Sequence, residues 1–170
     1  ERHIRFSDLP LLKDIVTTEF NIEGYPSEYF VREVLDCKPD QVTLVPDPPE
    51  ALTSNTGWDT RSNLEFLKSI VHKFKNEGIR VSLFLNPEPE LVTYAAQTGA
   101  DRIELYTGLY SKQFVKNPIA AVTPHIQTGL EALKFGLGLN AGHDLNLENL
   151  KFYKDHVEGL MEVSIGHALV

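Results

Sequence analysis

Apolar and polar positions along this chain change period several times, which predicts a regular alternation of strands and helices. Short runs rich in β-branched residues, such as Gln41-Val42-Thr43-Leu44-Val45, are typical of buried strands. Longer segments repeat apolar residues every three or four positions, as Leu64, Leu67 and Val71 do, which is typical of amphipathic helices. The predicted strands cover residues 19–23, 41–45, 80–85, 102–107, 137–141 and 160–165. The predicted helices cover residues 9–17, 28–36, 63–77, 90–98, 118–135 and 147–154.

Strict alternation of this kind predicts βαβ units and a parallel sheet, either open or closed into a barrel. No Gly-x-Gly-x-x-Gly follows the first strand and no Gly-x-x-x-x-Gly-Lys occurs, so the usual signals of an open nucleotide-binding sheet are missing. We therefore predict an α/β fold, a (β/α)8 TIM barrel of which the chain covers about six of the eight strands. Residues 1–170 are interpreted as one barrel domain whose N-terminal strands and last helix are missing.

Composition narrows the possible partners. The net charge of -8 argues against nucleic acid or an anionic membrane as partner, because binding phosphates over a surface needs clustered Lys and Arg. A small anionic substrate is still compatible with this net charge, since backbone N–H groups can bind an anion locally. The single cysteine, Cys37, excludes an internal disulfide and fits a reducing, cytoplasmic compartment. No apolar run reaches membrane-spanning length.

Several predicted strands end in residues with useful chemistry. Glu23, Glu104, His143 and His167 would meet at one mouth of a barrel, where two or more titratable groups can act as general acid and base. Structural roles stay open for each: Glu23 as an exposed loop carboxylate, Glu104 as an ion-pair partner of Arg102, and His143 as a helix cap. Three further histidines, His72, His125 and His156, lie on predicted helix faces or loops and are expected at the surface.

Two further segments suit a phosphate group. In Gly166-His167-Ala168, glycine would let backbone N–H groups approach a phosphate closely, although a tight turn would also need it. The loops after the last two barrel strands are frequent phosphate sites. Thr53, in a long predicted loop at 47–59, offers a hydroxyl for a phosphate or for a turn hydrogen bond.

Eight segments in order along the chain together resemble a known enzyme family. They are Glu1-Arg2-His3-Ile4, Phe20-Asn21-Ile22-Glu23, Val42-Thr43-Leu44-Val45-Pro46, Thr56-Gly57-Trp58-Asp59, Val81-Ser82-Leu83-Phe84, Ile103-Glu104-Leu105-Tyr106-Thr107-Gly108, Asn140-Ala141-Gly142-His143 and Ile165-Gly166-His167-Ala168. The family that they resemble is pyridoxine 5′-phosphate synthase. The match runs over essentially the whole chain.

This resemblance implies a (β/α)8 barrel with extra helices, assembled into a homo-octamer. It implies condensation of 1-deoxy-D-xylulose 5-phosphate with 3-amino-2-oxopropyl phosphate, two small phosphorylated substrates, to give pyridoxine 5′-phosphate, phosphate and water in vitamin B6 biosynthesis. It also implies that neither a metal nor an organic cofactor is needed. Imine formation, dehydration and ring closure each move protons without a redox step, which carboxylates and imidazoles can serve.

The resemblance also implies residue roles. Glu23 matches the catalytic acid/base glutamate, His143 the catalytic proton donor, and Glu104 the glutamate of transition-state stabilisation. Substrate contacts are implied at His3, Thr53, Asp144, Gly166 and His167. Asp144 departs from the family pattern, which has glycine there. Its backbone N–H could still bind a phosphate while its carboxylate turns away to cap the next helix, whereas an inward carboxylate would repel the phosphate.

The family's first two strands, with an Asn-x-Asp-His segment, an arginine and a His-x-Arg, are expected upstream of Glu1. Without them, we expect open strand edges and poor independent folding of the 170 residues. Two other functions remain open. One is a non-catalytic sugar-phosphate-binding barrel. The other is a different phosphosugar aldolase or isomerase, which ranks last because no predicted strand ends in a lysine for Schiff-base chemistry.

Overall fold

The computed structural model describes residues 4–47 and 56–166 of the chain, and the order of its strands and α-helices is the predicted one except for one additional helix after the fourth strand. The strands are β1 (Asn21–Gly24), β2 (Gln41–Leu44), β3 (Arg80–Leu85), β4 (Arg102–Tyr106), β5 (Gly138–Gly142) and β6 (Leu160–Ser164). The helices are a short 3-10 helix η1 (Phe6–Asp8), α1 (Leu9–Ile15), α2 (Glu28–Cys37), α3 (Leu64–Asn76), α4 (Pro89–Gln97), α5 (Gly108–Phe114), α6 (Pro118–Lys134) and α7 (Leu150–His156).

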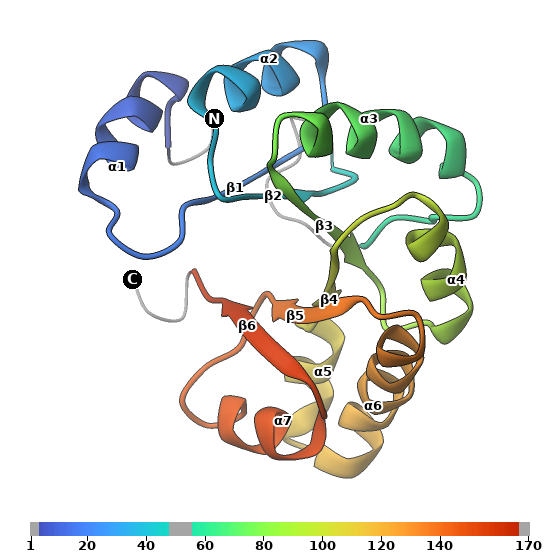
Figure 1. Cartoon of the computed structure of the whole chain (residues 1–170). Coiled ribbons are helices and arrows are strands. Elements are labelled where there is room, and N and C mark those ends of the chain that lie inside the picture. The colour runs from blue at the N-terminus through green and yellow to red at the C-terminus, as the bar shows by residue number, and fades with distance from the viewer. Residues whose placement is uncertain (1–3, 48–55, 167–170) are drawn as a thin grey trace.

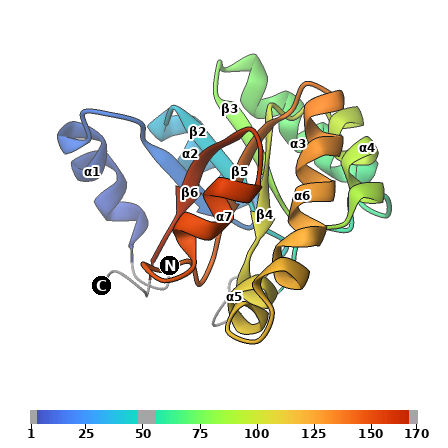
Figure 2. The ribbon, with the colours of Figure 1, turned by 90° about the horizontal axis from the view of Figure 1, so that it is seen from below.

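All strands lie parallel in one six-stranded sheet, in the order β1-β2-β3-β4-β5-β6. Figure 1 shows the sheet curled into an arc with the helices on its outer side, and Figure 2 shows the same arrangement from below. In this sheet, strands that follow one another in the sequence are also neighbours in space, and the sheet curls towards closure. This is the arrangement of a partial (β/α)8 barrel. The predicted barrel is therefore confirmed, and the open doubly wound sheet is wrong.

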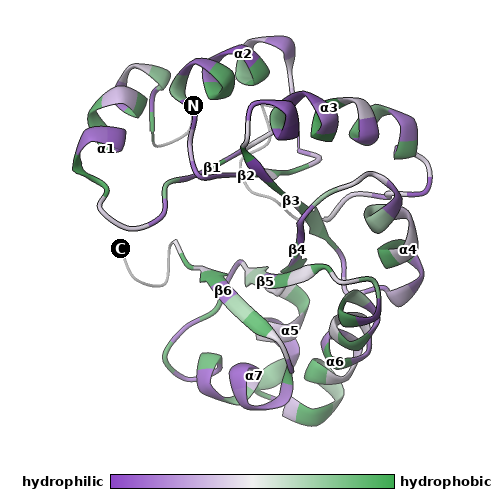
Figure 3. Ribbon diagram, in the orientation of Figure 1, coloured by the Kyte–Doolittle hydropathy of each residue, from purple (hydrophilic) through white to green (hydrophobic). Residues whose placement is uncertain are grey.

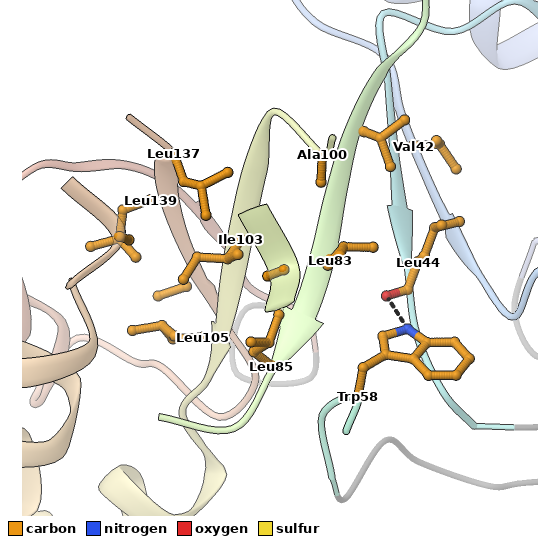
Figure 4. Close-up of a cluster of buried hydrophobic side chains, with 14 of the residues drawn as sticks. Val42, Leu44, Trp58, Leu83, Leu85, Ala100, Ile103, Leu105, Leu137 and Leu139 are labelled. Atoms are coloured by element: carbon orange, nitrogen blue, oxygen red, sulfur yellow. Dashed lines mark hydrogen bonds between the residues drawn. The ribbon is translucent and has the colours of Figure 1, made fainter. Parts of the chain in front are cut away.

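The two faces of the sheet have opposite polarity, as the period of 2 in a strand requires. Side chains of one set, including Val42, Leu44, Leu83, Ile103 and Leu139, are fully buried in the core between sheet and helices. Figure 4 shows this layer, and Figure 3 shows the change of hydropathy along the ribbon. The alternate positions face the inside of the arc and carry mostly polar groups: Asn21, Glu23, Thr43, Ser82, Arg102, Glu104, Asn140 and Glu162.

The helix ends follow local chemistry where the chain supplies it. The Ser27 side chain accepts a hydrogen bond from Phe30 N at 3.1 Å, which caps α2 as predicted. Asn117 does the same for α6, through Ala120 N at 3.1 Å. Gly99, with φ +84°, follows α4 at the predicted stop, where a residue without a Cβ adopts the left-handed conformation at low cost.

Two elements differ from prediction. Helix α5 is absent from the prediction, because its seven residues are too few to show a helical period. Helix α7 begins at Leu150 rather than at 147. The reason is Asn146, whose Oδ1 accepts from Glu148 N at 2.9 Å and Asn149 N at 3.2 Å and so holds a turn before the helix.

The segment after β2 returns to the sheet through one tryptophan. Trp58 Nε1 donates to the carbonyl oxygen of Leu44 at 2.9 Å (Figure 4), and Trp58 N donates to Phe84 O at 2.8 Å. A Cβ on Gly57 would lie 2.2 Å from the backbone of Leu85 and Asn86, so only glycine fits this approach. Residues 47 and 56–59 carry no helix or strand, in agreement with the predicted loop.

Candidate active site

Glu104 lies in the middle of β4 and is almost completely buried, with 1% of its surface exposed. Burial, followed by the negative charge of Glu23, raises the pKa of this carboxyl to about 8. Glu162 adds to the rise, while hydrogen bonding to the Ser164 and Thr43 hydroxyls opposes it. Glu104 is therefore largely protonated at neutral pH, so it can donate a hydrogen bond or a proton.

Glu23 comes from β1 and stands in register with Thr43 on β2. Glu104 comes from β4, between Phe84 on β3 and Asn140 on β5. The curl of the sheet brings their charges close enough for Glu23 to shift the pKa of Glu104. Two carboxyl groups whose charges interact in this way can divide one proton between them, which is an arrangement that acid/base chemistry uses.

Gly142 ends β5 directly beside this pair. A Cβ at this position would lie 2.1 Å from Glu104 Oε1 and 3.1 Å from the Ser164 Cβ. The backbone of Gly142 has no positive φ. The glycine is therefore required by the space that the Glu104 carboxyl occupies, and it fixes the distance between this carboxyl and the next residue, His143.

His143 and Asp144 form a turn in which both residues have positive φ, +86° and +58°. Such angles are uncommon outside glycine and occur most often in turns and at functional sites. The His143 ring stands edge-on to Tyr106, with ring centroids 5.3 Å apart. Its Nδ1 lies 3.3 Å from Asp144 Oδ2.

The segment after β4 holds this turn by its carbonyl groups. Thr107 N donates to Gly142 O at 2.9 Å. The single proton of the Thr107 hydroxyl is directed at Gly142 O, at 2.6 Å, and is shared with His143 O. Ser111 Oγ, on α5, donates to Asp144 O at 2.9 Å. The unpredicted helix α5 therefore contributes directly to the position of the His143 turn.

The structure brings together three of the predicted residues: Glu23, Glu104 and, through Gly142, His143. Gly166 follows β6, is exposed, and has nothing within 4 Å of where a Cβ would be. Asp144 directs a carboxylate oxygen to the His143 ring. His3, Thr53 and His167 lie outside the described residues.

Contacts in the structure decide two of the alternative roles considered above and correct one prediction. Arg102 pairs with Glu162 at 2.7 Å and lies 4.0 Å from Glu19, so it is not the partner of Glu104. Asn146, rather than Asp144, supplies the side-chain oxygen at the start of α7. His125 is not a surface residue as predicted but is 1% exposed, because it packs between Tyr110 and Tyr153; His72 and His156 are exposed as predicted.

Sequence reasoning missed two residues that border this site. Tyr106 is 5% exposed, and burial raises the pKa of its hydroxyl, with further contributions from the charges of Asp144 and Asp47. Asp47 is 8% exposed and its Oδ2 has no hydrogen-bond partner among the described residues. The strand period was a usable signal for Tyr106, since it lies two residues after Glu104 on the same face.

In the described part of the chain, no group of three or more His, Cys, Asp or Glu is arranged to hold a metal ion. None of the described helices is both long enough and apolar enough to cross a membrane.

A family model described as "Pyridoxal phosphate biosynthesis protein PdxJ" matches residues 1–170. The chain belongs to this family. Curated relatives named pyridoxine 5′-phosphate synthase include those of Bacteroides thetaiotaomicron and Phocaeicola vulgatus, each 54% identical over 170 residues. That of Flavobacterium johnsoniae is 51% identical. These alignments cover 100% of this chain and 72%, 71% and 72% of the three relatives. The family expected from the eight sequence segments is confirmed.

Proposed function

We propose that this chain carries the activity for which its relatives are named, pyridoxine 5′-phosphate synthesis. The reaction condenses 1-deoxy-D-xylulose 5-phosphate with 3-amino-2-oxopropyl phosphate and releases phosphate and water. The observation that carries this proposal is the electrostatic interaction of Glu23 with the protonated, buried Glu104, beside the His143 turn, in a chain of this family.

Each residue takes a role that suits its surroundings. Glu23 acts as acid and base, because it shares its environment with a carboxyl that holds a proton at neutral pH. Glu104 donates a hydrogen bond from its neutral form to oxygen atoms that gain charge during dehydration and ring closure. His143, with 24% of its side chain exposed, donates the proton to the leaving group.

The substrate phosphates are assigned to backbone groups and hydroxyls. His3 and Thr53 bind the deoxyxylulose phosphate, and Gly166 with His167 binds the phosphate of the amino-oxopropyl substrate. Exposure of Gly166 and the open space around it suit close approach of an anion to its N–H. Asp144 contributes its backbone N–H, since its carboxylate is turned to His143. A homo-octamer and a cytoplasmic location belong to the same proposal.

The test uses the full-length protein that contains this chain, supplied with both substrates. Pyridoxine 5′-phosphate and inorganic phosphate should be released in equal amounts. The Glu23→Gln variant should lose at least about 100-fold in kcat while it still binds inorganic phosphate, because the variant removes a proton-transfer group and leaves the phosphate contacts. Glu65→Gln, an exposed carboxylate on α3, is the matched control and should keep full activity.

Two results would contradict the proposal. A folded wild-type protein that binds phosphate but forms no product would indicate a non-catalytic sugar-phosphate-binding barrel. Normal turnover by Glu23→Gln would remove Glu23 from the acid/base role.

A further inference from the structure

One nitrogen of the His143 ring lacks a conventional partner. His143 Nδ1 is buried and makes no hydrogen bond within the described residues. Asp144 Oδ2 lies 3.3 Å away, within reach but without the alignment of a hydrogen bond. Because Nδ1 is shielded from solvent, water cannot replace the carboxylate as its partner. The 24% of the side chain that is exposed belongs to other atoms of the residue.

The Asp144 backbone is fixed from two directions. Its carbonyl oxygen accepts hydrogen bonds from Ser111 Oγ at 2.9 Å and from Asn149 Nδ2 at 3.3 Å. Asn149 is 2% exposed, and its Oδ1 accepts from Asn146 N at 2.9 Å. Tyr110 OH donates to Asn149 O at 2.7 Å. This network holds the Asp144 backbone in place, with its Oδ2 3.3 Å from His143 Nδ1.

The Tyr106 ring packs against the His143 ring, with ring centroids 5.3 Å apart and an interplanar angle of 77°. Contacts with an aromatic ring and a carboxylate restrict the orientation of the imidazole, and the carboxylate determines which nitrogen carries the proton. An acceptor at Nδ1 favours the Nδ1–H form, whereas free neutral histidine favours Nε2–H. With Nδ1–H donated to Asp144, Nε2 carries the lone pair. Nε2 first takes up a proton from solvent or substrate, which gives the imidazolium, and then donates this proton to the leaving group.

We propose that Asp144 is a positioning residue that accepts a hydrogen bond from His143 Nδ1 and so selects Nε2 as the proton-transferring nitrogen. This inference rests on the proposed function for its catalytic consequence, but the pairing itself is a property of the protein without substrate. The role differs from substrate binding, since it acts through the side chain of Asp144 and not through its N–H.

The backbone of Asp144 allows a clean test. Its φ of +58° suits asparagine and glycine, so Asp144→Asn and Asp144→Gly should keep the turn. The full-length protein, labelled with 15N-histidine, is studied by solid-state NMR at a pH where His143 is neutral. The His143 signals are identified by their loss in a His143→Gln variant. The wild type should show protonated Nδ1 and unprotonated Nε2, and Asp144→Gly should revert to Nε2–H.

Steady-state kinetics are measured on the same proteins. Asp144→Gly should lower kcat by roughly 10- to 100-fold and leave both KM values within about twofold. The loss is smaller than the ~10⁴-fold effect of replacing the buried aspartate of a serine-protease triad, because the Asp144 side chain is 42% exposed. Asp144→Asn, which keeps an oxygen acceptor without the charge, should fall between wild type and Asp144→Gly. Asp155→Asn on α7 is the charge-matched control and should change neither readout.

The outcomes separate this inference from the proposed function. An active wild type whose His143 tautomer is the same in Asp144→Gly overturns the inference alone. Unchanged kcat with a lower KM in Asp144→Gly also overturns it, because Asp144 would then act by repelling the substrate phosphate. An inactive wild type contradicts the proposed function, while a tautomer change in Asp144→Gly would still support the pairing.

Discussion

At the scale of single residues, burial rather than residue type decides what Glu104 can do. Glutamates with ordinary exposure are ionised at neutral pH, and the sequence shows only that this one lies within an apolar strand. Its surroundings come from three other strands: Glu23 on β1, Thr43 on β2, and Glu162 and Ser164 on β6. The protonation state of Glu104, and with it the role of this residue, therefore depends on neighbours that are far away in the sequence.

The raised pKa of Glu104 makes a prediction about stability. Folding takes up a proton at pH values between the usual pKa of 4.5 and the folded value of about 8. The stability from this group is therefore full below pH 4.5 and is lost as the pH rises through 8. Glu104→Gln stays neutral, so its free energy of unfolding relative to wild type should rise by up to about 1.4 kcal/mol per pH unit across this window.

Urea denaturation from pH 4.5 to 8.5 measures this difference, together with the expected loss of turnover. Glu65→Gln, exposed on α3, should parallel the wild type. A Glu104→Gln curve parallel to the wild type would show that Glu104 is ionised in the folded protein.

His125 gives a prediction of the opposite sign. Burial lowers the pKa of this imidazole to about 4 from 6.5, and its Nδ1 lies 2.9 Å from Tyr153 OH. Below pH 6.5 the exposed histidine of the unfolded chain takes up a proton that the buried histidine does not. The contribution of this group to stability is therefore full above pH 6.5 and is lost as the pH falls toward 4.

His125→Gln should therefore remove a slope of up to about 1.4 kcal/mol per pH unit between pH 4 and 6.5. His72→Gln, exposed on α3, is the control that should keep the wild-type slope. The check is the unfolding free energy of the three proteins at several pH values in this range. Equal slopes in all three would place the His125 ring in contact with solvent.

At the scale of elements, the strands were largely predictable, and the predicted ranges contain most of the observed residues. Their apolar side chains alternate with polar ones, a pattern that no helix shares. Helix α5 was not predictable in this way, since it depends on Tyr110 being buried against Tyr153 and His125. The burial of His125 had a usable signal, because it lies on the same helical stripe as Ala121, Thr128 and Ala132.

The end of β5 gives a prediction at this scale. Gly142→Ala should cost about 1–3 kcal/mol in stability, because the new Cβ would lie 2.1 Å from Glu104 Oε1. Turnover should fall as well, since either the carboxyl or the His143 turn must move. Thermal unfolding and kcat are the measurements.

Gly136→Ala is the matched control for that variant. Gly136 has open space around it but a φ of +70°, so the cost should be about 1–2 kcal/mol from backbone strain alone, with kcat unchanged. If Gly142→Ala kept full kcat, the close packing of Gly142 against Glu104 would have no catalytic role.

At the scale of the whole molecule, the described sheet has two edges, β1 and β6. Unpaired edge strands are templates for association with other strands. We expect residues 1–170, prepared alone, to associate as concentration rises, as sedimentation velocity can measure. Met161→Lys places a charge on the exposed surface of edge strand β6 and should weaken this association.

Ile119→Lys is the control, because Ile119 is 59% exposed but lies on α6, away from both edges. It should leave the association as in the unmodified chain. A monomer that unfolds cooperatively at all concentrations would contradict the expectation.

The sequence by itself determined the order of elements, the parallel sheet and the family, because hydrophobic period and short motifs are local properties. It also named Glu23, Glu104 and His143 as candidate catalytic residues. Only the tertiary structure decided the protonation of Glu104, the need for Gly142 and the contact of Asp144 with His143. The first two depend on distances and solvent exclusion between strands, which exist only once the sheet has curled. The third depends on a turn that Thr107 and Ser111 hold from outside it.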